Sequence, residues 1–241
     1  MTFDAAIHLF LDAPASGMRL RAHFCTAHTI VEANEDEHLM QALDQGEIVT
    51  SDGMPIVWLL RAMGYRAERV YGPDVLLAVA DRSRDRSLRH YFYGGGPGIA
   101  EALAERLRSR YPGMIVAGAE MPPFRALSAS ERREAIGRIN ASGADYVWVG
   151  LGTPKQDFWL ADNRADLDAS VLFAVGAAFD FLSGAKRHAP RLMQRTGTEW
   201  LFRLSTEPGR LWRRYLLGNA RFLTLVVRDV ARRRRTGRVR R

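Results

Sequence analysis

The sequence predicts an α/β protein, with a Rossmann-like, mostly parallel sheet flanked by helices. Short apolar runs alternate with longer amphipathic runs along most of the chain, the pattern of strands joined by helices into a parallel sheet. Two glycine-rich segments, GGGPG and GLGTP, each follow a predicted strand and precede a predicted helix. With 241 residues, 47% of them hydrophobic, the chain can bury a sizeable core.

The short apolar runs are the predicted strands, at residues 22–26, 47–50, 90–93, 114–117, 146–149 and 171–175. The stretches between them carry apolar residues at helical spacing. They are the predicted helices, at residues 29–44, 55–63, 73–81, 98–111, 129–141 and 155–162. Because helices join successive strands, we expect right-handed parallel crossovers.

The chain changes in character near residue 190, which separates a predicted Rossmann-like body, residues 1–190, from an arginine-rich helical appendage, residues 191–241. Aromatic and aliphatic residues recur at helical spacing among the arginines, which predicts two or three amphipathic helices. From Lys186 onward, 17 Lys or Arg stand against three acids, so this end carries about +14 and the rest about −6 of a net charge of +8. Arginine favours phosphate contacts, so an anionic partner is expected.

The composition disfavours several classes of protein. Cys25 is the one cysteine of the sequence, so it predicts neither a disulfide framework nor a Cys/His metal cluster, and a reducing, cytosolic setting is the default. The first 21 residues lack a basic leader and do not predict a signal peptide. No window reaches the roughly 18 uninterrupted apolar residues of a transmembrane helix.

Polar residues and glycines follow several predicted strands at the edge where open α/β sheets bind ligands. These positions are Thr26, His28, Asp52, Gly94, Gly95, Gly96 and residues 121–124 and 150–156. The amides of the GGG turn suit a phosphate or diphosphate, although a tight turn with positive φ also explains such glycines. The spacing is not the dinucleotide fingerprint and there is no P-loop, so a nicotinamide-dependent oxidoreductase and a P-loop nucleotidase are disfavoured.

Each polar candidate also has an ordinary structural explanation. Asp52 precedes a predicted helix and can be its N-cap, and His28 can be a polar residue at a helix start. Arg69 can pair with Glu68 or Asp74, the latter itself a candidate N-cap.

The segment VGLGTPKQDFW repeats the pattern of strand, glycines and helix start. Gly150 and Gly152 form the turn, and Lys155 adds a phosphate contact or is simply solvated. Gln156 projects from the first turn of the helix, where a structural role is equally ordinary.

Three interpretations of the appendage are open: a solvated charge run, a nucleic-acid arm that uses the arginines at 232–235, and a surface that binds anionic lipid. The interleaved Trp, Leu and Phe residues argue against a solvated run, and a nucleic-acid arm does not need so much apolar surface. An anionic membrane surface is therefore the favoured partner, with no nucleic acid. A nucleic-acid-binding module is the alternative to an enzyme.

Seven segments between about residue 21 and residue 223 resemble, in order, the WecG/TagA/CpsF glycosyltransferases. They are CTAHTIVEA, SDGMPIVWLLR, ERVYGPDVL, YFYGGGPGIAE, VGLGTPKQDFW, VGAAFDFLSGAKRHAPRLMQRTGTEWLFRL and EPGRLWRRYLLGN. The resemblance implies a bacterial inverting enzyme, peripheral on the cytoplasmic face of the membrane. It would move a sugar from a UDP-sugar donor to a polyprenyl-diphosphate-linked acceptor, in teichoic acid, common-antigen or exopolysaccharide synthesis. The donor sugar (N-acetylmannosamine, its uronic acid, glucose or glucuronic acid), the acceptor sugar and the oligomeric state, a homo-oligomer included, stay open.

The family pattern also implies roles for residues. Asp52 matches the aspartate proposed as catalytic base, and Thr26, Arg69 and Gln156 match an active-site threonine, arginine and glutamine. The appendage matches a segment that closes over the site and helps to bind the membrane; its candidate arginines are Arg203, Arg210, Arg213 and Arg214. Many members have Asn where this chain has His28, which puts the part of His28 in substrate selection in question.

One base suffices for inverting transfer by a single displacement, because only the acceptor hydroxyl must lose a proton. A two-carboxylate scheme would need a partner for Asp52, and the sequence designates none. No D-x-D triplet follows a predicted strand. We therefore expect the glycine amides and arginines, without a metal or other cofactor, to stabilise the UDP leaving group.

Overall fold

The computed structural model describes residues 1–235; residues 236–241, the end of the predicted appendage, lie outside the described residues. The described part contains one six-stranded, all-parallel sheet in the order β2-β1-β6-β5-β3-β4, which confirms the Rossmann-like α/β prediction. The strands are β1 (Leu20–Cys25), β2 (Ile48–Ser51), β3 (Arg89–Gly94), β4 (Ile115–Glu120), β5 (Tyr146–Gly150) and β6 (Val171–Ala174).

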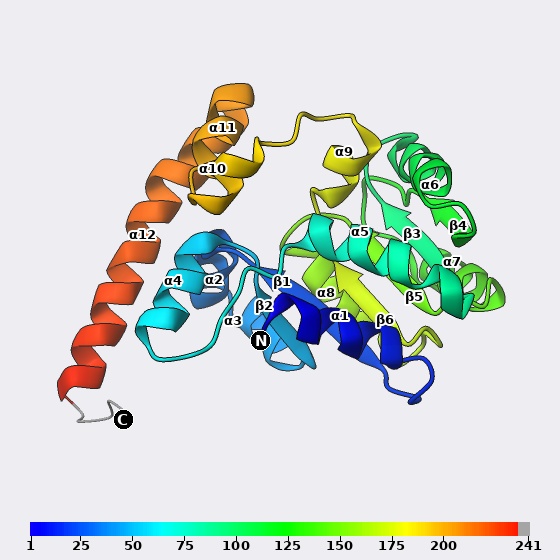
Figure 1. The fold of residues 1–241 in the computed structure, drawn as a ribbon, viewed down its shortest axis with the longest axis horizontal. Coiled ribbons are helices and arrows are strands. Elements are labelled where there is room, and N and C mark those ends of the chain that lie inside the picture. Colours follow the sequence, from blue (N-terminus) through cyan, green and yellow to red (C-terminus); the bar gives the residue numbers. More distant parts are fainter. Residues whose placement is uncertain (236–241) are drawn as a thin grey trace.

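Helices cover both faces of the sheet, and the appendage helices lie along one side of the ribbon (Figure 1). In the body they are α1 (Phe3–Asp12), α2 (Ala27–Glu35), α3 (Glu37–Asp44), α4 (Met54–Ala62), α5 (Gly72–Arg82), the 3₁₀ turn η1 (Arg84–Arg86), α6 (Ile99–Arg110), α7 (Ala129–Ala141), α8 (Lys155–Asn163) and α9 (Ala178–Ser183). In the appendage they are α10 (Arg191–Arg195), α11 (Glu199–Thr206) and α12 (Pro208–Arg235).

Several helical features of the body differ from the sequence-based expectation, and α9 and η1 were not predicted. The predicted helix at residues 29–44 is two helices, because Asp36 adopts an extended conformation and its carboxylate accepts hydrogen bonds from the His38 and Leu39 amides at the start of α3. The N-terminal segment, for which no element was predicted, forms α1. Ile7 and Phe10 of α1 are fully buried in the core, so this helix is part of the body.

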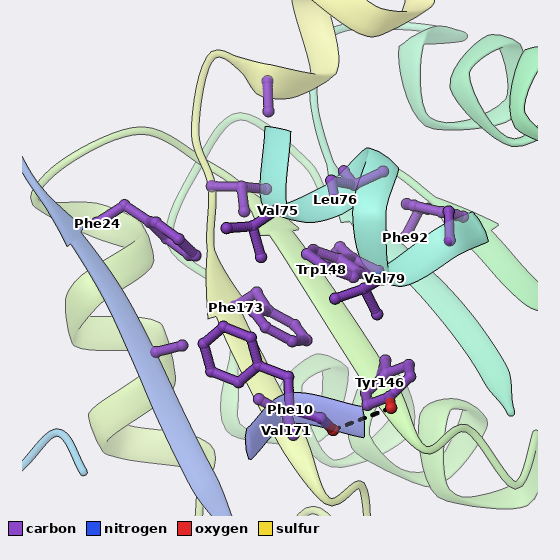
Figure 2. Packing of buried hydrophobic residues seen from close by; sticks show 14 of the residues in the cluster. Phe10, Phe24, Val75, Leu76, Val79, Phe92, Tyr146, Trp148, Val171 and Phe173 are labelled. Carbon is purple, nitrogen blue, oxygen red and sulfur yellow. Dashed lines mark hydrogen bonds between the residues drawn. The ribbon is translucent and has the colours of Figure 1, made fainter. Parts of the chain in front are cut away.

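The main core lies between the sheet and the helices α1, α5, α6 and α9 (Figure 2). Alternate strand residues point to opposite faces. Trp148 stacks on Phe173, with the ring centroids 3.9 Å apart, and its Nε1 donates to Nδ1 of the buried His90 at 3.0 Å. The Tyr146 hydroxyl donates to the Phe10 carbonyl at 3.0 Å, which satisfies the polar atom of a buried ring. Residues of the opposite face pack against α7 and α8.

The appendage packs on the body through α12, which lies against α2. Phe222 of α12 is buried among residues of α2, α3 and α4, such as Val31, Leu39 and Ile56. At the periphery, Arg221 forms an ion pair with Glu35 at 3.0 Å. Among residues 1–235, no helix has the length and apolar character needed to cross a bilayer.

Candidate active site

A cleft of about 990 Å³ opens beyond the carboxyl ends of the strands, with walls from the body and from the appendage. Most of the predicted site residues line it: Thr26, His28, Asp52, Arg69, Gly95, Gly96, Gly150, Gly152, Lys155, Gln156, Arg203, Arg210 and Arg214. Gly94 and Arg213 lie outside the lining. The topology thus brings together residues that are up to 188 positions apart, Thr26 to Arg214, at one edge of the sheet.

Asp52 directly follows β2, and its backbone N–H donates to the Cys25 carbonyl at 2.9 Å. The N-cap of α4 is Gly53, without a side-chain cap, so the interpretation of Asp52 as an N-cap is wrong. Its side chain is 14% exposed and faces the cleft. A carboxylate that is not occupied by capping can accept a proton from a bound substrate.

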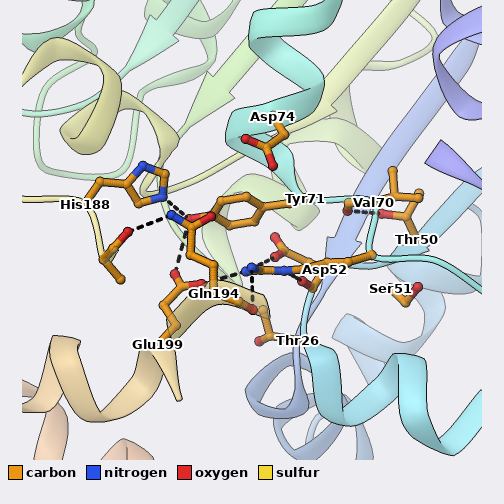
Figure 3. A network of polar contacts seen from close by, with 12 residues as sticks. Thr26, Thr50, Ser51, Asp52, Val70, Tyr71, Asp74, His188, Gln194 and Glu199 are labelled. Atoms are coloured by element: carbon orange, nitrogen blue, oxygen red, sulfur yellow. Dashed lines mark hydrogen bonds and ion pairs between the residues drawn. The ribbon is translucent and has the colours of Figure 1, made fainter. Parts of the chain in front are cut away.

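Asp52 belongs to a polar network that includes Tyr71 and Glu199 (Figure 3). Arg69 lies beside Asp52 and contacts it twice. Its Nε donates to the Asp52 backbone carbonyl, and its Nη2 lies 3.6 Å from Oδ1 of the Asp52 carboxylate. The same Nη2 donates to Oε2 of Glu199 at 2.7 Å. Arg69 therefore pairs with neither Glu68 nor Asp74; Asp74 instead binds Arg191 at 2.8 Å. Asp74 is also not an N-cap, because that position of α5 is Tyr71.

Burial raises the pKa of Asp52 to about 7, since ionisation inside the protein costs solvation energy. The Arg69 cation opposes this shift, the Glu199 carboxylate adds to it, and a hydrogen bond from the Gly72 amide opposes it. Asp52 is thus a carboxylate whose pKa suits proton transfer near neutral pH.

Glu199, from α11, joins the site although no sequence pattern singled it out. Its Oε1 accepts a hydrogen bond from the Tyr71 hydroxyl at 3.2 Å, and that hydroxyl lies 2.8 Å from Nε2 of His188. The Arg69 guanidinium stacks over the Tyr71 ring at 3.9 Å. One signal was available: Glu199 is one of the few acids in the arginine-rich end of the chain. Its partners, however, are distant in sequence and could not be identified.

Thr26 and His28 stand at the start of α2, on the wall of the cleft. Thr26 is the N-cap, with β1 ending one residue earlier than predicted: its Oγ1 accepts from the Thr29 amide, and its own N–H donates to Oγ1 of Thr29. Burial, then the charges of Arg214 and Arg203, lower the pKa of His28 to about 4. His28 is therefore neutral at neutral pH, and both its ring nitrogens can serve hydrogen bonding.

Three arginines of the appendage also line the cleft: Arg203 from α11, and Arg210 and Arg214 from α12. Among the described residues, no protein group accepts a hydrogen bond from Nε of Arg203 or Arg214, although both atoms are buried. Burial, together with the neighbouring Arg203 and Arg210, lowers the pKa of Arg214 to about 10. Arg210 is paired with Glu207 at 2.6 Å, whereas the unsatisfied donors of Arg203 and Arg214 are suited to an anion.

Arg213 differs from its neighbours in the appendage. Its guanidinium lies over the Trp212 ring at 5.2 Å, on the exposed part of α12 and outside the cleft lining. The prediction that Arg213 binds substrate finds no geometric support, because successive helix positions are rotated by about 100°.

The glycine turn is required by packing as well as by any ligand. Gly94 has φ of +122°, and a Cβ there would lie 2.8 Å from the Gly150 backbone. A Cβ on Gly150 would lie 2.7 Å from the Phe179 ring. The Gly95 amide donates to the Gly150 carbonyl at 2.9 Å. The expectation that all three GGG amides face a phosphate is therefore wrong at Gly95, since its amide is already used within the protein.

Gln156 is buried and links two strand ends. Its Oε1 accepts from the Gly152 amide at 3.0 Å, and its Nε2 donates to the Ala174 carbonyl at 2.8 Å. Both contacts hold the backbone that shapes the cleft floor, as the structural interpretation anticipated. Lys155 lines the same part of the cleft and is exposed.

Aromatic side chains line the end of the cleft near β3 and α8. The rings of Tyr93 and Trp159 stack at 4.8 Å, and the loop after β4 adds the exposed Phe124. Such surfaces suit a planar base or the apolar face of a sugar. Within residues 1–235, no group of three or more His, Cys, Asp or Glu side chains could hold a metal ion.

Comparisons with known proteins identify the family to which this sequence is similar. The sequence model of the glycosyl transferase WecG/TagA/CpsF family matches residues 1–236. The chain is similar to an N-acetylglucosaminyldiphosphoundecaprenol N-acetyl-beta-D-mannosaminyltransferase of Bacillus spizizenii, with 29% identity over 198 residues, 82% of this chain and 74% of the relative.

Proposed function

This chain belongs to the WecG/TagA/CpsF glycosyl transferase family, and we propose that it transfers a sugar with inversion from a UDP-sugar to a polyprenyl-diphosphate-linked acceptor. Asp52 is the general base of this proposal. The supporting observation is the position of Asp52 in a cleft that is also lined by Arg203 and Arg214, whose buried Nε atoms have no acceptor within the described residues. A base and a diphosphate site in one cleft are what a single displacement requires.

In this mechanism Asp52 takes the proton of the acceptor hydroxyl as its oxygen attacks the anomeric carbon. The bond from that carbon to the UDP oxygen breaks at the same time, and UDP leaves with an additional negative charge. Arg203 and Arg214 bind the diphosphate and stabilise that charge, as guanidinium groups do at transferred phosphates. Because these cations supply the charge, we propose that transfer needs no metal ion.

The relative from Bacillus spizizenii suggests the substrates. Its name specifies transfer of N-acetyl-beta-D-mannosamine to an N-acetylglucosaminyl group on diphosphoundecaprenol. We extend that acceptor class to this chain. For the donor, N-acetylmannosamine is the first choice, with its uronic acid, glucose and glucuronic acid as the further members of the panel.

A panel of UDP-sugars tests the proposal directly. With a short-chain polyprenyl-diphosphate-linked N-acetylglucosamine, one UDP-sugar is expected to give UDP release and a β-linked disaccharide, and EDTA is expected to leave the rate unchanged. Without the acceptor, release should fall to the rate of donor hydrolysis. Release that does not depend on the acceptor would contradict a transferase.

We also propose that α12 holds the enzyme on an anionic membrane surface at the cytoplasmic face. Five of its exposed apolar side chains form one stripe, at Trp212, Leu216, Leu223, Val227 and Val230, and are spaced so that all five fall on one side of the helix; Leu217, also exposed, lies off this stripe. The same helix carries most of the arginines of the appendage. Apolar burial and attraction between arginines and lipid headgroups would act together.

Replacing the centre of the stripe tests this placement. Leu223 and Val227 are 62% and 66% exposed, so Leu223→Asp with Val227→Asp should leave the fold intact. We expect binding to vesicles that contain anionic lipid to weaken by about tenfold or more, since two apolar contacts are lost and charge repulsion is added. Vesicle sedimentation measures it, with Met40→Asp, an exposed position of α3, as the control. Unchanged binding of the double variant would remove α12 as the contact.

A further inference from the structure

Glu199 brings the appendage into contact with the residue that flanks the proposed base. The Arg69 guanidinium has three sets of partners: the Asp52 backbone carbonyl, the Gln194 carbonyl of α10 at 3.3 Å, and the Glu199 carboxylate of α11 at 2.7 Å. Two of these three come from the appendage. The carboxylate of Asp52, at 3.6 Å, is farther from Nη2 than that of Glu199.

The distances show which carboxylate holds the cation. A charge-assisted hydrogen bond requires about 2.7 to 2.9 Å, so Arg69 makes one with Glu199 and not with the Asp52 side chain. The Tyr71 hydroxyl donates to the other oxygen of Glu199, which fixes the orientation of this carboxylate. Arg69 also stacks on the ring of Tyr71, so Glu199 contacts both partners of this stack.

We propose that Glu199 is a positioning residue, which draws the Arg69 guanidinium away from the Asp52 carboxylate and so prevents a direct hydrogen bond between these two side chains. The inference rests on the proposed function, because it assigns Asp52 as the base. Its consequence is that docking of α10 and α11 and competence for proton transfer are linked through one side chain. Without Glu199, Arg69 can approach Asp52 and turn it into a weaker base.

The other groups near Asp52 do not raise its pKa as the Glu199 carboxylate does. Arg203 of α11 and the Gly72 amide stabilise the charged form, as Arg69 does. Cys25 of β1 and Tyr71 are neutral at neutral pH, since burial raises the pKa of both. Glu199 is thus the anionic neighbour whose removal should make Asp52 easier to ionise.

The test is the pH profile of Glu199→Gln, which keeps the size of the side chain and removes its charge. We expect the acid limb of kcat/KM to move to lower pH by about one unit. The ratio of variant to wild-type kcat/KM then rises about tenfold as the pH falls from 8.5 to 5.5. The matched control is Asp74→Asn, which also breaks an ion pair between the body and the appendage, with Arg191 of α10 at 2.8 Å, and which should leave the limb in place.

A ¹³C NMR titration of Asp52 in the free protein separates this inference from the proposed function. A lower Asp52 pKa in Glu199→Gln supports the ion-pair exchange whether or not Asp52 proves to be the base. An unmoved Asp52 titration together with an unmoved acid limb would overturn the inference, and a uniform loss of kcat at every pH would show that Glu199 only docks the appendage.

Discussion

Asp52→Asn is expected to lower kcat for sugar transfer by about 10²- to 10⁴-fold while KM for both substrates changes little. Asn has the shape of Asp but cannot accept the proton of the acceptor hydroxyl. Because Asp52 lies in the cleft without capping a helix, the loss should reflect chemistry and not local unfolding. Steady-state UDP release at saturating acceptor measures it.

Asp74→Asn is the matched control. Asp74 is another carboxylate among the residues drawn in Figure 3, but it pairs with Arg191. Its replacement should change kcat only a few-fold. Wild-type turnover in Asp52→Asn would remove the assigned base and with it the single-displacement mechanism proposed here.

The pKa of Asp52 also predicts how the transfer rate and the stability of the protein depend on pH. With burial holding that pKa at about 7, the base is protonated in acid, so the wild-type rate should rise with pH through about 7.

The free energy of unfolding should depend on pH in the opposite direction. Unfolded Asp loses its proton near pH 4, so between about pH 4 and 7 the folded state binds more protons, and the free energy of unfolding falls as pH rises. Asp52→Asn removes this penalty and should melt above the wild type at pH 8.

The architecture could be predicted from the sequence because strands and helices leave periodic local signals. All six strands were located to within a few residues, and their carboxyl ends indicated the edge at which the cleft opens. The split at Asp36 was missed, since a single capping side chain interrupts an otherwise continuous helical pattern.

The details of the site depend on contacts that local patterns do not encode. Glu199 meets Arg69 across 130 positions, and only the docking of α11 brings them together. Likewise, four appendage arginines looked alike in sequence, whereas the rotation of α12 separates Arg213 from Arg214. Burial also gave opposite pKa shifts to Asp52 and His28, and burial follows from tertiary packing.

Arg214→Ala should lower kcat for transfer by about 10²- to 10³-fold, the cost of removing one preorganised donor at a developing anion. Arg214 is a strong candidate because its Nε is buried and no protein group within the described residues accepts from it, while its neighbours Arg203 and Arg210 are cations. Bringing like charges together inside a protein is unfavourable unless an anion binds between them.

Arg213→Ala is the matched control, since Arg213 is adjacent on α12 but has its guanidinium over Trp212 and outside the cleft. With a short-chain acceptor that needs no membrane, the effect of Arg213→Ala on kcat should stay within a few-fold.

Isothermal titration with UDP gives a second measurement: the affinity for UDP should fall in Arg214→Ala and stay unchanged in Arg213→Ala. Since a bound diphosphate compensates the repulsion between Arg214 and Arg203, the wild type should also gain thermal stability from UDP, and Arg214→Ala should gain less. Equal effects of the two substitutions would mean that the general charge of α12, and not this cluster, holds the donor.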